Sequence, residues 1–288
     1  MNVIEYFNDI HIIQIGAGGT GSWLVPLVSK LINNIKLRIR EDQKITYNII
    51  DSDIVEERNI LRQNFTSWDI YKNKAQALVN RYSEDFPEIK AINKYIKTEN
   101  ILIDLLYKID IVCYISKTHS DNFPNLIEKL SECETTKHDL MIFLGCVDNN
   151  KTRRIIFKTL KKLEKRVPTR FVEYYNDGFI LDGVCERSII YIDSGNSLYN
   201  GQIATTKFYA NDIIKDNNSK KLNFLKMFPI EQQEQEAQSC AFFGDQSQCV
   251  NNLAASLVFA NLQKILVNNE LPPNLIEFNS SGFCNFKI

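Results

Sequence analysis

A glycine-rich loop between an apolar strand and a helical segment is the part of the sequence best suited to binding a phosphate. Residues 10–15 are apolar and β-branched, and residues 22–31 place apolar side chains at helical spacing. The loop between them, Gly16-Ala17-Gly18-Gly19-Thr20-Gly21, lets backbone N–H groups and the positive end of the helix face an anion. The loop does not separate ATP from NAD or FAD, because its spacing also satisfies the G-x-G-x-x-G pattern.

Charged residues follow two further predicted strands. Residues 46–50 read as a strand ending at Asp51, where a carboxylate commonly accepts hydrogen bonds from ribose hydroxyls; a surface turn over 51–53 is the alternative. Arg62 and Lys74 come next, and Asp148 comes directly after a later apolar strand. Two cations and an acid around a phosphate loop suit a triphosphate with its magnesium ion better than a dinucleotide.

These residues need a sheet whose strands end at one edge. Strands expected at 46–50, 88–96, 109–115 and 140–147 alternate with helices expected at 74–81, 123–130 and 151–166. The alternation predicts an α/β, Rossmann-like fold with a mainly parallel sheet. Residues 1–166 are then the nucleotide-binding half.

The pattern changes after residue 166. Residues 179–184, 188–193 and 201–207 alternate like antiparallel strands, so we expect residues 167–288 to extend the sheet in the antiparallel sense. A polar stretch at about 211–240 is expected to be a mobile crossover segment. A helix over 250–266 and one or two strands over 275–288 close the chain. We expect one domain spanning 1–288.

The composition favours a reduced cytoplasmic protein. The 34 basic and 35 acidic residues nearly balance, which gives no support for binding nucleic acid or a membrane surface. The N-terminus lacks the features of a signal peptide, and no apolar run approaches the roughly 20 residues of a membrane helix. The seven cysteines form no Cys-x-x-Cys pair, which argues against a disulfide framework and a structural zinc site.

The ordered motifs resemble the ThiF/MoeB/ubiquitin-activating superfamily. Its signature is a GxGGxGS loop, then DxDxVxxxNxxRQ, then a lysine and later a DN pair. The chain matches this signature with Gly16, Gly18, Gly19, Gly21, Ser22, Asp51, Asp53, Val55, Asn59, Arg62, Gln63, Lys74, Asp148 and Asn149. Four elements in this order over about half the chain form a specific signal.

The resemblance implies a site for ATP and Mg²⁺, to which all these matched residues except Val55 contribute. It implies that Asp51 binds the ribose, that Asn59, Arg62 and Lys74 bind the phosphates, and that Asp148 binds magnesium. The implied activity is adenylation of the C-terminal carboxylate of a small ubiquitin-like protein ending in Gly. A carboxylate with a pKa of about 3.5 arrives ionised and needs no general base. Because relatives are commonly dimers, we expect a homodimer.

The second half resembles the ThiF-like proteins of bacterial PRTRC gene clusters. The similarity lies in residues 191–196 with 201–202, then in 238–241, and in Asn251. The chain departs from the superfamily where other members have a zinc site, and where some have an N-terminal helix that supplies an arginine to the partner subunit. Arg58 is a candidate to replace that arginine.

Cys240 is a candidate nucleophile. A thiol in a polar segment before a helix could attack the acyl-adenylate to give a thioester, and an unreactive thiol is the alternative. Cys249, just before the predicted helix, is a weaker candidate, whereas Cys113, Cys146 and Cys284 lie in apolar strands.

Two other functions remain open from the sequence. The glycine loop alone would suit an NAD- or FAD-dependent oxidoreductase. A non-catalytic nucleotide-binding subunit is the second alternative, although Arg62, Lys74 and Asp148 together argue against it.

Overall fold

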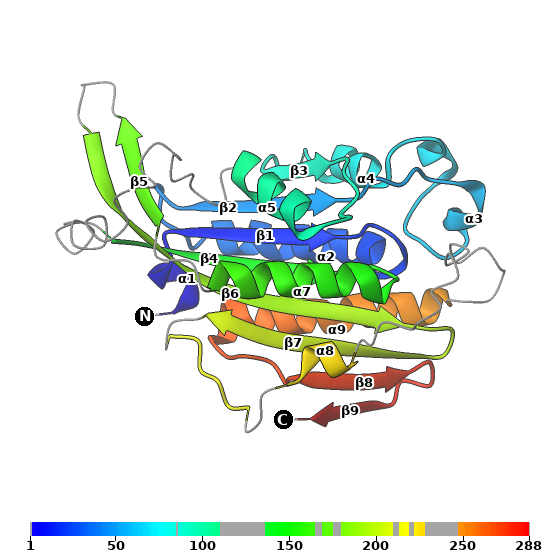
Figure 1. The fold of residues 1–288 in the computed structure, drawn as a ribbon. Coiled ribbons are helices and arrows are strands. Elements are labelled where there is room, and N and C mark those ends of the chain that lie inside the picture. Colours follow the sequence, from blue (N-terminus) through cyan, green and yellow to red (C-terminus); the bar gives the residue numbers. More distant parts are fainter. Residues whose placement is uncertain are drawn as a thin grey trace.

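The protein is a layered α/β molecule with one mixed sheet between two layers of helices (Figure 1). The computed structural model describes residues 2–84, 86–109, 136–164, 169–174, 180–209, 213–218, 222–227 and 247–287. The strands are β1 (Asp9–Ile15), β2 (Lys44–Ile50), β3 (Ile89–Ile92), β4 (Thr136–Gly145), β5 (Thr169–Tyr174), β6 (Ile180–Asn196), β7 (Asn200–Tyr209), β8 (Leu275–Asn279) and β9 (Cys284–Lys287).

The order of these strands is β3-β2-β1-β4-β6-β7-β8-β9, with β5 pairing on β6. The first five in this order pair in parallel, and the pairs from β6 through β9 are antiparallel. The chain runs from β1 to β2 on one side, and β4 lies on the other side of β1. The carboxyl end of β1 is therefore the switch point where open α/β sheets bind ligands.

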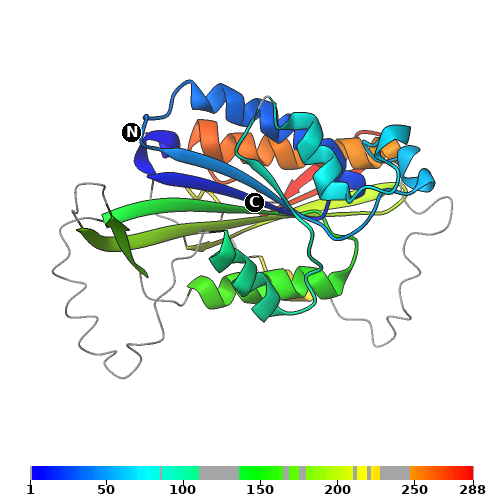
Figure 2. The same ribbon diagram turned by 90° about the horizontal axis from the view of Figure 1, so that it is seen from above.

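Helices cover both faces of the sheet (Figure 2). Their bounds are α1 (Val3–Tyr6), α2 (Gly19–Lys36), α3 (Glu57–Ile60), α4 (Lys74–Tyr82), α5 (Glu99–Lys108), α7 (Asn150–Glu164), α8 (Phe224–Met227) and α9 (Gln248–Asn268), with a 3₁₀ turn η1 at Ser67–Asp69. Helices α2, α4 and α9 share one apolar core with the sheet, and α5, α7 and α8 share the core on the other face.

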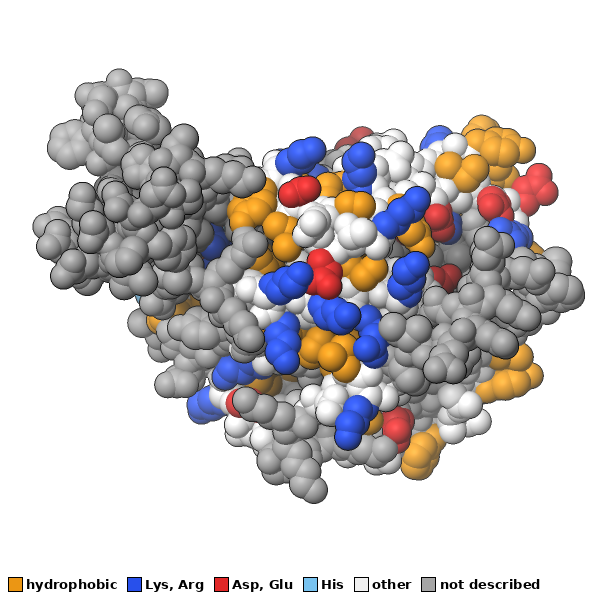
Figure 3. All heavy atoms as spheres, viewed as in Figure 1, with side chains coloured by type: hydrophobic (Ala, Val, Ile, Leu, Met, Phe, Trp, Pro, Cys, Tyr) orange, Lys and Arg blue, Asp and Glu red, His pale blue; other side chains and the backbone are white. Residues whose placement is uncertain are grey.

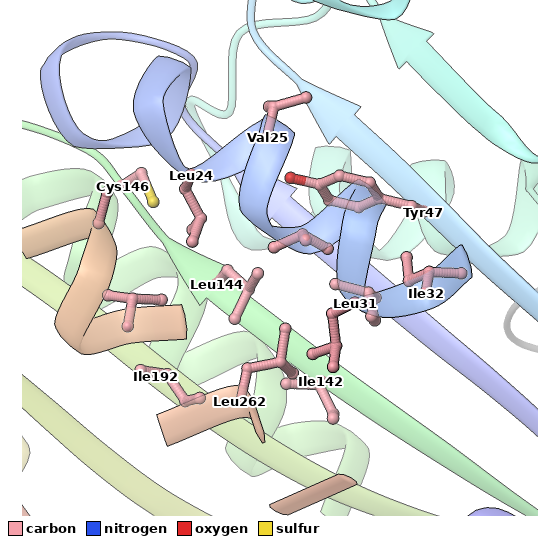
Figure 4. Packing of buried hydrophobic residues seen from close by; sticks show 14 of the residues in the cluster. Leu24, Val25, Leu31, Ile32, Tyr47, Ile142, Leu144, Cys146, Ile192 and Leu262 are labelled. Atoms are coloured by element: carbon pink, nitrogen blue, oxygen red, sulfur yellow. The ribbon is translucent and has the colours of Figure 1, made fainter. Parts of the chain in front are cut away.

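The larger core lies between the sheet and the α2–α9 pair (Figure 4). Leu24 and Leu31 of α2 and Leu262 of α9 pack towards Ile142 and Leu144 of β4. Residues 140–144 are all buried, on both faces of the strand. This is why β4 reads as a continuous apolar run in the sequence, as parallel strands covered on both sides do.

The structure confirms the predicted Rossmann-like class, the mainly parallel sheet and its antiparallel extension. One strand assignment was wrong: the segments expected as two strands, 179–184 and 188–193, are described from residue 180 on as the single strand β6, which pairs in parallel with β4 and antiparallel with β7. A single strand can do both because its two edges are independent. Most of the expected strand at 109–115, the helix at 123–130 and most of the segment 211–240 lie outside the described residues.

Helix α5 was not predicted, although the sequence contains its signals. Thr98 caps it, since its Oγ1 accepts a hydrogen bond from the Ile101 N–H at 3.3 Å. Leu102, Leu105 and Leu106 are buried at helical spacing against the sheet.

Helix α9 corrects the expectation that no segment is long and apolar enough to cross a membrane. Its length and composition alone would allow it to cross a membrane, since the mean hydropathy of its most apolar window is 1.2. Half of that window is buried inside the protein. Ala254, Val258 and Leu262 pack in the main core. That position is typical of a core helix, so its length and apolar composition give little support for a membrane span.

The face that carries α5 and α7 is rich in basic side chains (Figure 3). Helix α7 buries Ile156, Leu160 and Leu163 against the sheet and exposes Lys151, Lys158, Lys161 and Lys162. Lys162 pairs with Glu99 of α5 at 2.6 Å. The helix predicted over 151–166 is therefore confirmed as α7, and it is amphipathic, with its charges on the solvent side.

Candidate functional site

A cavity of about 470 Å³ opens at the carboxyl ends of the parallel strands. Its wall includes these predicted site residues: Gly16, Gly18, Gly19, Asp51, Asp53, Asn59, Arg62, Gln63, Lys74, Asp148 and Asn149. Gly21 and Ser22 are not on the wall, and Cys240 lies outside the described residues. One cavity thus collects residues spread over more than 130 positions of the sequence.

The glycine loop leaves space for a ligand on one side and packs tightly on the other. Gly16 has a φ of +102°, and a Cβ there would overlap the carbonyl oxygen of Cys146. A Cβ on Gly18 would meet only Gln63 Nε2, at 3.9 Å. Helix α2 begins at Gly19, so its first N–H groups have no intrahelical acceptor. This side of the loop suits an anion.

Gly21 and Ser22 stabilise the glycine loop from the side away from the cavity. A Cβ on Gly21 would overlap the carbonyl oxygen of Gly16, so glycine is needed for close packing. Ser22 is fully buried, and its Oγ accepts a hydrogen bond from the Asn64 N–H at 2.9 Å. Neither residue lies on the cavity wall, so what the structure shows for both is a supporting role, and their predicted contact with the cofactor stays a prediction.

Two buried residues that the sequence analysis missed hold the loop in shape. Gln14 of β1 donates from Nε2 to the carbonyl oxygens of Gly16, at 2.9 Å, and Gly21, at 3.1 Å. Tyr47 of β2 donates to Gln14 Oε1 at 2.5 Å, and burial raises the pKa of Tyr47 well above its usual value. The only signal in the sequence is a polar residue inside the apolar strand 10–15.

Asp51 joins the glycine loop to the next strand. Its Oδ2 accepts from the Ala17 N–H at 2.6 Å, and its Oδ1 accepts from the Asp53 N–H at 2.7 Å. Burial raises the pKa of Asp51, while nearby Lys74 and these two N–H groups lower it. Each carboxylate oxygen has a second lone pair, so a ribose contact is compatible with this geometry.

Lys74 is a buried cation at the start of α4. Only 9% of its side chain is exposed, and its Nζ lies 3.0 Å from Asp53 Oδ2. Asn73 fixes this helix end, because its Nδ2 donates to the carbonyl oxygens of Asp51 and Asp53. The positive charge is therefore held in place before any ligand arrives.

The turn after α3 carries the other predicted phosphate contacts. Asn59 is buried, and its Oδ1 accepts from the Glu56 N–H at 2.9 Å, so it caps α3. Half-buried Arg62 and buried Gln63 lie on the cavity wall. Within the described chain, Gln63 Oε1 is buried without a hydrogen-bond partner. Arg58 also lines the cavity and pairs with Glu56.

Asp148 and Asn149 also line the cavity, from the segment between β4 and α7. Asp148 is exposed to the cavity, and Asn149 caps α7 by accepting from the Thr152 N–H at 2.8 Å. In the described ranges, no three His, Cys, Asp or Glu side chains converge as a ready metal site. A single carboxylate fits Mg²⁺, which usually takes one or two carboxylates together with phosphate oxygens and water.

A buried ion pair under the site was also missed. Arg153 Nε lies 3.1 Å from Asp193 Oδ2, and both side chains are almost fully buried. Tyr191 donates to Asp193 Oδ1 at 2.6 Å. Arg153 also donates to the carbonyl oxygens of Val147 and Ser194. This network fixes the segment that carries Asp148, and the sequence shows only a basic residue on a basic helix.

The described cysteines should differ sharply in reactivity. Burial raises the pKa of Cys146 to about 12, whereas Cys249 is exposed at the start of α9. Because the thiolate is the reactive form, we expect iodoacetamide at pH 8 to modify Cys249 and spare Cys146 in the native protein. Peptide mass spectrometry reads both sites, and a denatured sample, in which both should react, is the control. Equal native labelling would contradict the buried position of Cys146.

Comparison with known proteins finds one family match and several similar solved structures. The ThiF family model matches residues 4–118, and no curated protein matches the chain. The structure of PaaA has a TM-score of 0.51 at 14% identity, covering 96% of this chain and 64% of PaaA. E. coli MccB with ATP has a TM-score of 0.51 at 15% identity, covering 96% of this chain and 63% of MccB.

At these identities the likeness shows the fold alone, and the chain spans less than two thirds of either relative. The family match covers β1, the glycine loop, Asp51 and Lys74, but it ends before Asp148. The N-terminal part of this chain, residues 4–118, thus matches the ThiF family, and the described chain as a whole has the fold of MccB and PaaA.

Proposed function

We propose that this chain is a ThiF-type adenylyltransferase, which uses ATP and Mg²⁺ to adenylate the C-terminal carboxylate of a polypeptide. The observation that carries the proposal is the single cavity shared by Gly18, Asp51, Arg62, Lys74 and Asp148. A phosphate cradle, a ribose acceptor, two cations and a metal-binding carboxylate are the parts that the reaction requires.

In this reaction the protein positions the substrates and neutralises their negative charge. The ionised carboxylate attacks the α-phosphorus, an acyl–phosphate bond forms, and the bond from the α-phosphorus to the bridging oxygen breaks as pyrophosphate leaves. Arg62 and Lys74 stabilise the charge that develops on the phosphates. Asp148 would hold Mg²⁺, which when bound would supply charge neutralisation at the leaving group. No general base is needed, since the nucleophile is already ionised.

A second cavity supports a polypeptide as the acyl substrate. It has a volume of about 600 Å³ and shares Asn196 with the first cavity. The residues on its wall whose side-chain amides could bond an extended backbone are Asn150, Asn196, Asn200, Gln202, Asn279 and Asn285. E. coli MccB has been crystallised with AMPCPP and MccA together, so in that relative both are bound at once. We propose a small ubiquitin-like protein ending in Gly as the substrate here.

ATP–pyrophosphate exchange tests the activity. Purified chain, ATP, Mg²⁺ and a small ubiquitin-like protein ending in Gly should transfer label from pyrophosphate into ATP. The same protein with its C-terminal Gly removed is the control. Calorimetry with ATP and with NAD⁺ or FAD tests the oxidoreductase alternative, and tight binding of either dinucleotide without ATP binding would sink the proposal. ATP binding without exchange across several substrates would favour a non-catalytic subunit.

Cys240 is the proposed acyl acceptor. Incubation with ATP and the protein substrate should give a covalent species on a non-reducing gel, which thiols cleave because a thioester is open to thiolate attack. Cys240→Ala should lose this species and keep pyrophosphate exchange, because adenylation precedes transfer. Cys249→Ala is the matched control and should keep both. An adduct that persists in Cys240→Ala would remove Cys240 from the reaction.

We also propose that the protein works as a cytoplasmic homodimer. Large apolar side chains are exposed on the segment that includes α3 and η1, at Leu61, Trp68 and Tyr71, and could bury one another across a subunit contact. Sedimentation velocity tests this, and a monomer at micromolar concentration would contradict it.

A further inference from the structure

The backbone of Arg62 is held by two helices that are far apart in the sequence. Trp23 Nε1 of α2 and Asn251 Nδ2 of α9 each donate a hydrogen bond to the Arg62 carbonyl oxygen at 3.2 Å. We refer to Trp23 and Asn251 as the Arg62 clamp. Because Arg62 lies on the wall of the first cavity, the clamp fixes the main chain of a residue that faces the proposed phosphate site.

Asn251 is an unusual residue for its position. It is fully buried, and Val250, Ala254 and Ala255 beside it on α9 are buried apolar residues of the main core. A buried amide is costly unless it is hydrogen-bonded. Its Oδ1 accepts from Asn196 Nδ2 at 2.6 Å, so both ends of the amide are used. Asn196 lies on the walls of both cavities, and Asn251 therefore links Arg62 to the edge of the second cavity.

Further hydrogen bonds hold Asn64, two positions after Arg62 in the same turn. Asn64 donates from its backbone N–H to Ser22 Oγ at 2.9 Å and from Nδ2 to the Ser22 carbonyl oxygen at 3.2 Å. Arg81 of α4 donates to the Asn64 carbonyl oxygen at 2.9 Å. The main chain of residues 62–64 is thus fixed by α2, α4 and α9 before any ligand binds. Such preorganisation is what makes a charge effective at a developing anion.

We propose that Asn251 and Trp23 are positioning residues that hold Arg62 for the phosphates of ATP. The inference rests on the proposed function, because it assigns Arg62 to the phosphates. It predicts an effect on phosphate recognition and none on recognition of the nucleoside, since the side-chain hydrogen bonds described for the clamp go to Arg62 and Asn196.

Calorimetry with ATP and with adenosine, both in the presence of Mg²⁺, separates these effects. The quantity of interest is the ratio of the Kd for adenosine to the Kd for ATP. Arg62→Ala should lower this ratio, and Asn251→Ala and Trp23→Phe should each lower it about five- to tenfold, as expected for one lost hydrogen bond. The double variant Arg62→Ala with Asn251→Ala should match Arg62→Ala alone, because there is then no guanidinium to position.

Asn261→Ala is the matched control. Asn261 is a buried asparagine on the same helix, and its Nδ2 donates to Thr205 Oγ1 at 3.3 Å, away from both cavities. It should lower the melting temperature and leave the ratio unchanged. If Asn251→Ala does not fold, Trp23→Phe decides, because it removes a donor to the same oxygen without altering α9.

The outcomes separate the two proposals. An unchanged ratio in the folded clamp variants, or additive losses in the double variant, overturns the positioning role while Arg62→Ala still supports the ATP site. A wild-type protein that binds ATP no more tightly than adenosine overturns both.

Discussion

Replacing Asp148 by alanine should reduce ATP–pyrophosphate exchange about a thousandfold and leave the fold intact. Asp148 is exposed and lies on the wall of the cavity that Lys74 and Arg62 also line, which suits a ligand of the magnesium ion. Loss of a metal contact costs several kcal/mol of transition-state stabilisation, and about 1.4 kcal/mol corresponds to a factor of ten in rate. Because the side chain is exposed, we expect its removal to cost little stability.

Two further variants sharpen this experiment. Asp148→Asn keeps the size of the side chain and removes only its charge, so it should lose nearly as much activity as Asp148→Ala. Asp104→Ala removes an exposed acid of α5 that is not on the cavity wall, and it should exchange at the wild-type rate. Wild-type exchange in Asp148→Ala, with circular dichroism unchanged, would take Asp148 out of the mechanism.

The part of the site that sequence could predict lies at strand ends. Gly16, Asp51 and Asp148 each follow an apolar strand closely, and parallel strands present their carboxyl ends at one edge of the sheet. Once the alternation of strands and helices predicts a parallel sheet, these three residues must come together. Lys74 is predicted to join them for the same reason, because it is the first residue of α4 and this helix begins at that edge of the sheet.

The supporting residues could not be predicted, because their partners are distant in the sequence. Asn251 bonds a carbonyl 189 positions away, and Arg153 pairs with Asp193 across two elements. The sequence shows one as an amide on an apolar helix, noted only for its resemblance to other proteins, and the other as a cation on a basic helix, so neither contact is visible in its own segment. Their roles depend on how α7 and α9 dock on the sheet, which no local pattern specifies.

The motif also could not predict that Gly21 and Ser22 lie away from the cavity wall. The motif GxGGxGS does not distinguish glycines that face a ligand from those that allow close packing. In the structure Gly18 is open to the cavity, whereas Gly21 packs on Gly16 and Ser22 bonds the turn at Asn64. Ser22→Ala is therefore a change to the support of the phosphate site and not to a ligand contact.

Lys74→Met should slow adenylation by a hundredfold or more, with a smaller loss of ATP affinity at neutral pH. A preorganised charge at a developing anion contributes about two to three orders of magnitude in rate. Lys74 satisfies that condition, because it is buried and its Nζ is held 3.0 Å from Asp53. Lys72→Met, at an exposed lysine two positions earlier that does not line the cavity, is the matched control and should keep the wild-type rate.

The loss should also depend on pH. Burial raises the pKa of Asp51, and the positive charge of Lys74 opposes that rise. Without Lys74 the pKa of Asp51 rises further, so this carboxyl group gains its proton at a higher pH than in the wild type. A protonated Asp51 is a poorer acceptor for a ribose hydroxyl and for the Ala17 N–H that holds the glycine loop. ATP affinity of Lys74→Met should therefore fall more steeply than that of the wild type as the pH is lowered, as calorimetry would show. Parallel pH profiles would mean that Lys74 acts on the phosphates alone, and a wild-type adenylation rate in Lys74→Met would mean that it does not act on them at all.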